Sequence, residues 1–145
     1  MTDLDYFPLN YLNARERFLA FRQQAAGKKS IDTWKIPSAS EGDLFSDSLY
    51  LPPISKKRTL FVFVSGVHGL EAYAGHAIQT MILKEYLPKI NRADAGFYFV
   101  HSLNPYGFKH HRRNTEAGVN LNRNCSASPS LYSIKNDESV RLSQM

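Results

Sequence analysis

The distribution of apolar and polar residues predicts a series of short elements in the N-terminal third of the chain. Residues 9–26, "LNYLNARERFLAFRQQAA", place Phe18 and other apolar residues among charges, which predicts a surface helix packed through one face and ended by Gly27. Two further runs, "TWKIPS" and "DLFSDSLYLPP", predict short strands separated by a turn-rich segment. Pro52 and Pro53 end the second strand.

The middle of the chain has the pattern of a strand–helix–strand unit. Residues 59–64, "TLFVFV", are continuously apolar, which is typical of a strand covered on both faces. From Glu71 to Leu87 apolar residues recur every three or four positions, which predicts a helix closed by Pro88. Residues 96–101, "GFYFVH", predict a second buried strand, and "NPYG" after it predicts a turn. Two apolar strands joined by a helix predict a parallel pairing and an α/β fold.

Composition indicates one globular domain. The chain has 145 residues, of which 43% are hydrophobic, enough for one core. No apolar run reaches the roughly 18 to 20 residues that cross a bilayer, and the start "MTDLDYFPLN" lacks the order of a signal peptide. Cys125 is the single cysteine, which excludes an internal disulfide and favours a reducing compartment. We therefore expect no membrane association and a cytoplasmic location.

The net charge of +5 raises the possibility of nucleic-acid binding. Much of the excess lies in "KHHRRNTEAGVNLNR", whereas "KKR" at 56–58 precedes a predicted strand and is most simply a solvated turn. Aromatic residues do not interleave with the basic ones, and no nucleic-acid motif is present. We therefore expect a local positive pocket for a small anion and no nucleic-acid partner.

The most informative residues follow the strand at 59–64. His68 and Glu71 lie in a glycine-flanked loop, at the carboxyl end of that strand, where ligands collect in parallel sheets. An imidazole and a carboxylate at this spacing can bind one zinc ion, which needs a third protein ligand and leaves a position for water. Gly66 and Gly69 allow the tight backbone that such convergence requires. The alternative is a helix-capping carboxylate beside a turn histidine.

The other histidines are weaker candidates. His76 falls inside the predicted helix, where a partly exposed position is expected. His110 and His111 adjoin arginines, which would repel a cation. His101 ends a strand, either behind a metal site or as a hydrogen-bonded polar group.

Permanently charged donors cluster between residues 112 and 123. Arg112 or Arg113, together with Asn122 and Arg123, bring guanidinium groups close together in the sequence, and guanidinium groups bind carboxylates through two hydrogen bonds. The alternative is a loop of solvated arginines.

Four short motifs in this order, "SGVHGLEAYAG", "NPYGF", "RRN" and "GVNLNRN", resemble the zinc carboxypeptidase superfamily. The resemblance is to a bacterial branch near the aspartoacylases and succinylglutamate desuccinylases, and it covers residues 59–124 well. It implies the N-terminal part of a three-layer fold with a mixed, partly parallel sheet and flanking helices. It also implies a zinc-dependent hydrolase that cleaves a peptide or N-acyl amino acid amide bond next to a free carboxylate.

The resemblance assigns roles to individual residues. His68 and Glu71 match the first two zinc ligands of the family. Arg112 in "RRN" matches the arginine that stabilises the oxyanion, with Arg113 as the rival if the register shifts by one. Asn122 and Arg123 match the pair that holds the substrate carboxylate, so the expected partner is a small molecule or peptide with a free carboxylate.

The family's third zinc ligand, a histidine, and its glutamate base lie beyond residue 145. We therefore expect a chain that matches only the N-terminal half of the fold and has little activity alone. The alternative is a non-catalytic remnant or anion-binding module. Half a sheet would expose strand edges, which favours self-association. Asn120 is a further departure, because relatives often carry aspartate there.

Overall fold

A computed structural model describes residues 3–24, 32–55, 59–126 and 128–130 of the chain. Two features expected from the sequence lie outside these residues: the end of the first helix at Gly27 and the basic turn at 56–58.

Four strands form one mixed sheet. The predicted strands are confirmed as β1 (Thr33–Ile36), β2 (Leu44–Leu51), β3 (Thr59–Val64) and β4 (Ala95–His101). Their order across the sheet is β1-β2-β4-β3. The β1/β2 and β2/β4 pairs are antiparallel, whereas β3 and β4 are parallel and joined through a helix, as the sequence predicts. The predicted α/β class with a mixed, partly parallel sheet is thereby confirmed.

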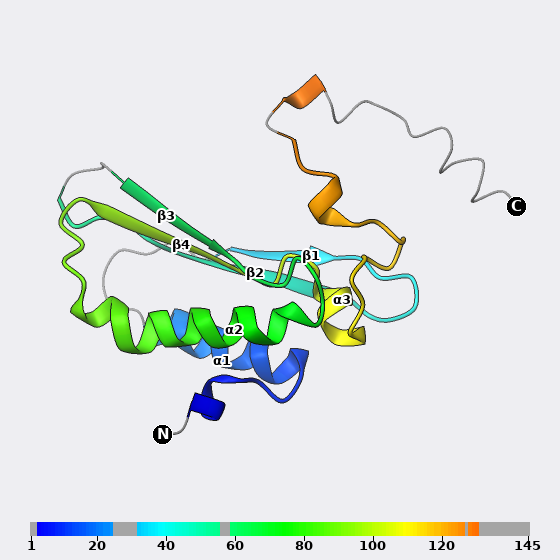
Figure 1. Cartoon of the computed structure of the whole chain (residues 1–145), viewed down its shortest axis with the longest axis horizontal. Helices are drawn as coiled ribbons and strands as arrows, with labels where there is room; N and C mark the ends of the chain where they lie inside the picture. Colours follow the sequence, from blue (N-terminus) through cyan, green and yellow to red (C-terminus); the bar gives the residue numbers. More distant parts are fainter. Residues whose placement is uncertain (1–2, 25–31, 56–58, 127, 131–145) are drawn as a thin grey trace, which may run out of the picture.

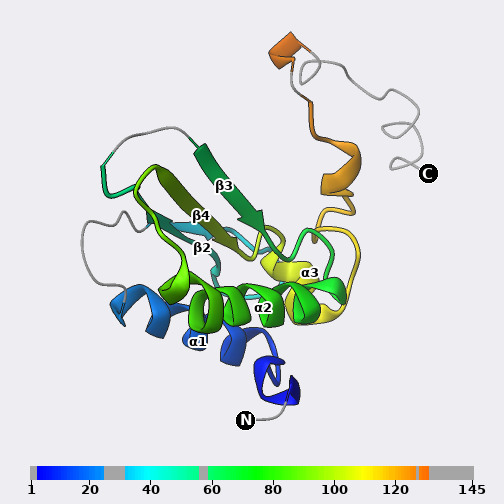
Figure 2. The same cartoon turned by 60° about the vertical axis from the view of Figure 1, so that its left-hand side comes forward.

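Two long helices lie on the same face of this sheet (Figures 1 and 2). They are α1 (Tyr11–Gln24) and α2 (Glu71–Met81), and α2 continues through a π-helical turn, Ile82–Tyr86, and a 3₁₀ turn, Leu87–Lys89. Within the described residues, none of the helices is long and apolar enough to cross a membrane.

The predicted turn at "NPYG" is the beginning of a short helix instead. This helix, α3 (Pro105–His110), lies at one end of the sheet (Figure 1). Asn104 caps it, because its Oδ1 accepts a hydrogen bond of 2.9 Å from the Gly107 backbone N–H. Pro105 occupies the first helical position, where its missing N–H costs nothing. The pattern predicts a turn wrongly because Asn-Pro begins helices as well as turns.

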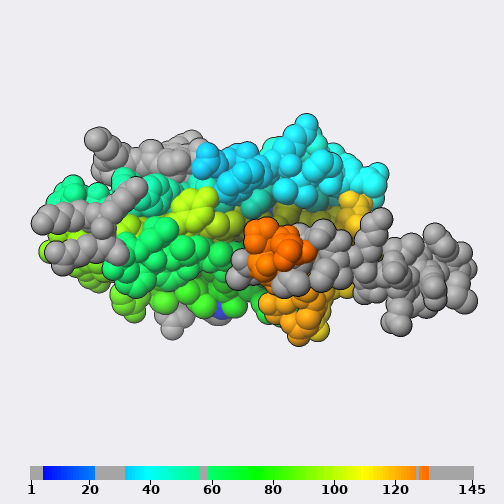
Figure 3. Space-filling view, turned by 90° about the horizontal axis from the view of Figure 1, so that it is seen from above, coloured from blue at the N-terminus to red at the C-terminus, as the bar shows by residue number. Residues whose placement is uncertain are grey.

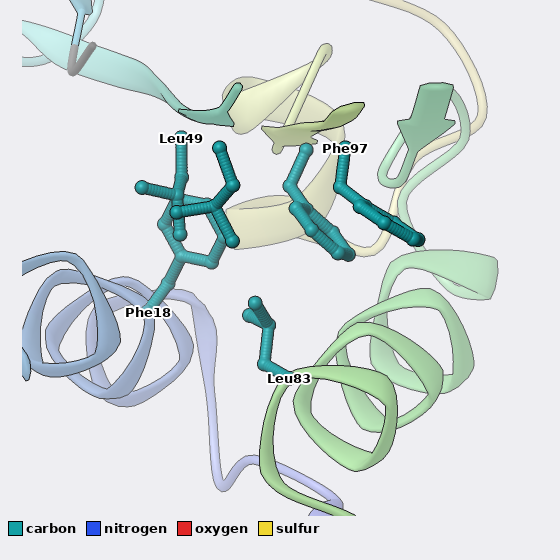
Figure 4. Close-up of a cluster of buried hydrophobic side chains, with 6 residues drawn as sticks. Phe18, Leu49, Leu83 and Phe97 are labelled. Atoms are coloured by element: carbon teal, nitrogen blue, oxygen red, sulfur yellow. The ribbon is translucent and has the colours of Figure 1, made fainter. Parts of the chain in front are cut away.

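Apolar side chains pack between the sheet and the two long helices. Phe18 from α1 and Leu83, from the π-helical turn after α2, contact Leu49, Phe97 and neighbouring residues of the sheet (Figure 4). Phe18 and Phe99 are buried almost completely. Burying one such side chain contributes about 1.5–3 kcal/mol, so this layer supplies much of the driving force for folding.

A second apolar cluster lies next to the first, near α3. Its buried members are Tyr11, Ala14, Leu44, Ala72 and Phe108. The Tyr73 and Phe108 rings meet edge to face, with centroids 4.9 Å apart. This cluster fixes α3, and with it the loops at the carboxyl ends of the parallel strands.

The prediction that β3 is covered on both faces is wrong for the described part of the chain. β3 is an edge strand there, and Leu60 and Val62 keep 54% and 55% of their surface exposed. Figure 3 shows β3 at the surface on the side opposite α1 and α2. An apolar run indicates that a strand is suited to burial, but the neighbouring elements decide whether it is buried. The expectation of an exposed strand edge is confirmed for these residues.

Candidate functional site

The candidate site lies where β3 and β4 end side by side. Because the two strands are parallel, the loops that follow them leave the same edge of the sheet. The backbone N–H of Leu103 donates to the Ser65 carbonyl at 2.9 Å, and that of Asn104 donates to the Gly66 carbonyl at 2.7 Å. These hydrogen bonds hold the two loops together beyond the last strand residues.

Two glycines let the loop that carries His68 pass close to the end of α3. A Cβ placed on Gly69 would lie 1.9 Å from the Gly107 carbonyl oxygen, and one on Gly107 would lie 2.5 Å from the Arg112 oxygen. The Gly69 N–H donates to the Arg112 carbonyl at 3.0 Å. The role of Gly69 is therefore this backbone contact between loops, which the sequence did not reveal.

The structure brings His68 and Glu71 together. His68 Nδ1 lies 3.2 Å from Glu71 Oε1, and Glu71 is the first residue of α2. The His68 side chain is mostly buried, with 13% exposed, whereas that of Glu71 is 71% exposed. A hydrogen bond from its own backbone N–H lowers the pKa of Glu71, and His68 and the charge of Arg113 act in the same direction. Glu71 is therefore a carboxylate at neutral pH.

Asn120 contacts the other side of the His68 ring. Its Oδ1 lies 3.1 Å from His68 Nε2 and also accepts a hydrogen bond of 3.1 Å from the Asn122 backbone N–H. Because the second donor identifies this atom as the amide oxygen, His68 Nε2 must be the N–H donor. The sequence marks Asn120 only as a departure from the aspartate of relatives and does not reveal this contact across 52 positions.

The geometry is compatible with two zinc ligands. Two ligand atoms about 2.1 Å from a tetrahedral zinc lie about 3.4 Å from each other, close to the observed distance between His68 Nδ1 and Glu71 Oε1. Within the described residues, no group of three or more histidine, cysteine, aspartate or glutamate side chains is placed to hold a metal ion. The fit therefore extends to His68 and Glu71, while the third ligand that zinc requires is not among these residues.

The predicted arginines and Asn122 lie on two segments that contact the His68 loop, one through the Arg112 carbonyl and the other through Asn120. The Arg112 carbonyl accepts the hydrogen bond from the Gly69 N–H, and the Arg112 side chain is exposed. Arg113 is the arginine whose charge acts on Glu71. Asn122 and Arg123 are exposed on the 3₁₀ turn Leu121–Arg123, directly after Asn120, and Arg123 Nη1 donates to the Asn122 carbonyl at 3.1 Å.

The prediction that His76 is partly exposed is wrong. It is fully buried, and its Nδ1 lies 3.1 Å from Nε2 of His101, which is also fully buried and stacks on Phe18. Burial lowers the pKa of each of these two histidines to about 3, so both are neutral. The helical period placed His76 on α2 but did not show that a buried polar partner on β4 faces it.

Solved structures of two bacterial proteins share this fold. A metallo-carboxypeptidase from Burkholderia cenocepacia matches 96% of this chain with a TM-score of 0.57 and 16% identity. A putative carboxypeptidase from Burkholderia mallei matches 81% with a TM-score of 0.56 and 24% identity. The matched regions are 38% and 32% of those chains, so this chain spans about a third of their length. The likeness shows a partial carboxypeptidase-like fold.

Comparison by sequence gives the family. No curated protein matches the chain significantly. Residues 7–138 match the family described as "Protein of unknown function (DUF2817)", and this region includes every described strand, both long helices and the His68 loop. The chain therefore belongs to the DUF2817 family of proteins of unknown function.

Proposed function

We propose that this chain carries part of the active site of a zinc-dependent hydrolase of the metallocarboxypeptidase class. The substrate is a peptide or an N-acyl amino acid, and the bond cleaved is the amide next to a free carboxylate. The fold shared with two carboxypeptidase structures supports the class, although this chain matches only 32% and 38% of those chains. The activity belongs to a site that the described residues form only in part.

The position of the His68 ring between Asn120 and Glu71 is the observation that carries this proposal. When Nε2–H donates to Asn120, a neutral ring directs the lone pair of Nδ1 at the Glu71 carboxylate. Two acceptors 3.2 Å apart repel each other unless a proton or a metal cation lies between them. A hydrogen bond from the second ring nitrogen, usually to a carboxylate, a backbone carbonyl or water, is also the common support behind a metal-ligating histidine.

The residues of this chain have separate tasks in the proposed reaction. His68 and Glu71 would hold zinc, which supplies a bound water of lowered pKa and polarises the amide carbonyl. Arg112, or Arg113 beside Glu71, would stabilise the negative charge that develops on the carbonyl oxygen. Asn122 and Arg123 would bind the substrate carboxylate, which sets the distance between that group and the cleaved bond.

A second candidate is an anion-binding module without catalysis. It is favoured by the lack of a third metal ligand among the described residues, since a two-ligand site binds zinc weakly. In this case the contact of 3.2 Å between His68 Nδ1 and Glu71 Oε1 is a hydrogen bond within the protein. The exposed arginines would still bind a carboxylate.

Zinc binding separates the two candidates. We expect the chain to bind zinc in a titration followed by elemental analysis, and His68→Ala to weaken the affinity by at least about tenfold. His110→Ala is the matched control, because His110 is exposed and paired with Glu41. Equal zinc binding by wild type and His68→Ala would remove His68 as a ligand and leave the anion-binding module.

We also propose that the chain associates with itself through β3 and is cytoplasmic, with no nucleic-acid partner. The support for self-association is the exposed apolar side chains Leu60, Phe61, Val62 and Val64. The support for the location is the single cysteine, Cys125.

A further inference from the structure

A largely apolar cavity lies beside the candidate site. Its volume is about 810 Å³, within the range of small-molecule sites in proteins. Its walls come from the segment between β1 and β2, the beginning of α3, and the loop before Leu121. The apolar lining includes Ile36, Leu44, Leu103, Pro105, Tyr106 and Leu121.

Two lining residues connect the cavity to His68. Asn104 lines the cavity, and its Nδ2 lies 3.5 Å from the Val67 carbonyl, next to His68 in the chain. Leu121 lines it as well and stands between Asn120, which contacts His68, and Asn122. The cavity lining therefore includes residues that adjoin, along the chain, both the His68–Asn120 contact and the Asn122–Arg123 pair.

The cavity walls are tied to each other by a carboxylate. Glu116 accepts hydrogen bonds from the backbone N–H groups of Ala39 and Ser40, both at 2.9 Å, and from Ser40 Oγ at 2.6 Å. Glu41, two residues after Ala39, pairs with Lys109 and His110 of α3. These hydrogen bonds and ion pairs join the separate segments around the cavity. They therefore favour a preorganised site.

We propose that this cavity binds the large apolar group of a substrate whose carboxylate is held by Asn122 and Arg123. The ligand class is an N-acyl amino acid with an aromatic or long aliphatic acyl group. Charge supports this occupant, since Leu121 in the apolar lining directly precedes the exposed Asn122 and Arg123 in the chain, and their amide and guanidinium groups suit a carboxylate. The position of the carboxylate rests on the proposed function, whereas the apolar subsite rests on the cavity itself.

The test compares two ligands that share one carboxylate. N-benzoylglycine and N-acetylglycine are titrated into the full chain and followed by ligand-observed NMR. We expect N-benzoylglycine to bind about tenfold more tightly, because only its ring is large enough to fill apolar space. Ala117→Trp places an indole at the cavity wall and should abolish this preference. Ala20→Trp, on the exposed side of α1, should leave it unchanged.

Each other outcome overturns the inference. Equal affinity of the two ligands, or no binding of either, excludes the cavity as an acyl-group subsite. A preference that survives Ala117→Trp places the ring elsewhere. If Ala117→Trp changes the oligomeric state in sedimentation and not ligand affinity, a second copy of the chain covers the cavity. Zinc binding by wild type and His68→Ala is measured on the same samples, so failure of the zinc hypothesis is distinguished from failure of the acyl subsite.

Discussion

Replacing Gly69 by alanine tests whether the contact between the His68 loop and the end of α3 holds the site together. The added Cβ would lie 1.9 Å from the Gly107 oxygen and 2.6 Å from the Arg112 oxygen, both backbone atoms. An ordinary contact begins at 3.4 Å, so the backbones must separate by on the order of 1.5 Å. That movement also disrupts the hydrogen bond of 3.0 Å from Gly69 N–H to the Arg112 carbonyl.

The expected loss is about 2–4 kcal/mol in the free energy of unfolding, from overpacking together with one lost backbone hydrogen bond. Urea unfolding monitored by circular dichroism measures it. Gly42→Ala is the matched control, because no atom lies within 4 Å of its added Cβ. That variant should match wild type or be more stable by up to about 1 kcal/mol, since alanine lowers the entropy of the unfolded chain. A Gly69→Ala protein as stable as Gly42→Ala would refute the close approach.

Three further predictions address other parts of the molecule. Burial lowers the pKa of His76 and of His101 to about 3 from an ordinary 6.5. Between about pH 6.5 and pH 3 the unfolded chain therefore binds protons at these two histidines that the folded chain does not. Stability to urea should therefore fall as pH decreases from about 6.5 toward 3, by up to about 1.4 kcal/mol per pH unit for each histidine; a slope unchanged in His76→Gln would contradict this. Glu116→Gln should speed hydrogen exchange at the Ala39 and Ser40 amides, because the substitution weakens the acceptor of their hydrogen bonds. Hydrogen bonds from Ser40 and Ala39 lower the Glu116 pKa to about 2, so in wild type the two amides should stay protected well below pH 4.5. Equal exchange in both proteins would exclude the contact. Val62→Lys on β3 should reduce concentration-dependent association in sedimentation, since a charge on an exposed strand edge opposes pairing, and an unchanged profile would exclude β3 as the interface.

The local order of the chain could be predicted from the sequence because it depends on residues close together along it. Apolar runs and helical periodicity located β3 at 59–64 and the start of α2 at Glu71 as observed. The placement of His68 at the carboxyl end of a parallel strand followed in the same way, because His68 directly follows the strand and two strands joined through a helix usually pair in parallel. The family resemblance selected the residues around 112 and 123, which charge alone would have left as solvated arginines.

Contacts between distant residues could not be predicted in this way. The hydrogen bond between His68 and Asn120 spans 52 positions, and the carboxylate of Glu116 reaches Ser40 across 76. Neither pair has a sequence period that would link its members. Burial could not be predicted for the same reason. His76 is buried where it contacts His101 and Thr80. β3 is exposed because, among the described residues, it is an edge strand and both long helices cover the same face of the sheet (Figures 1 and 2).

The sequence by itself determined which segments become strands and helices and which residue types stand at the ends of the parallel strands. Only the tertiary structure decided the contact of His68 with Asn120, the close passage of Gly69 against Gly107, and the apolar cavity beside Leu121. The physical reason is that secondary structure reflects the period of neighbouring side chains, whereas a binding site depends on atoms that chain folding brings within about 3 Å of each other.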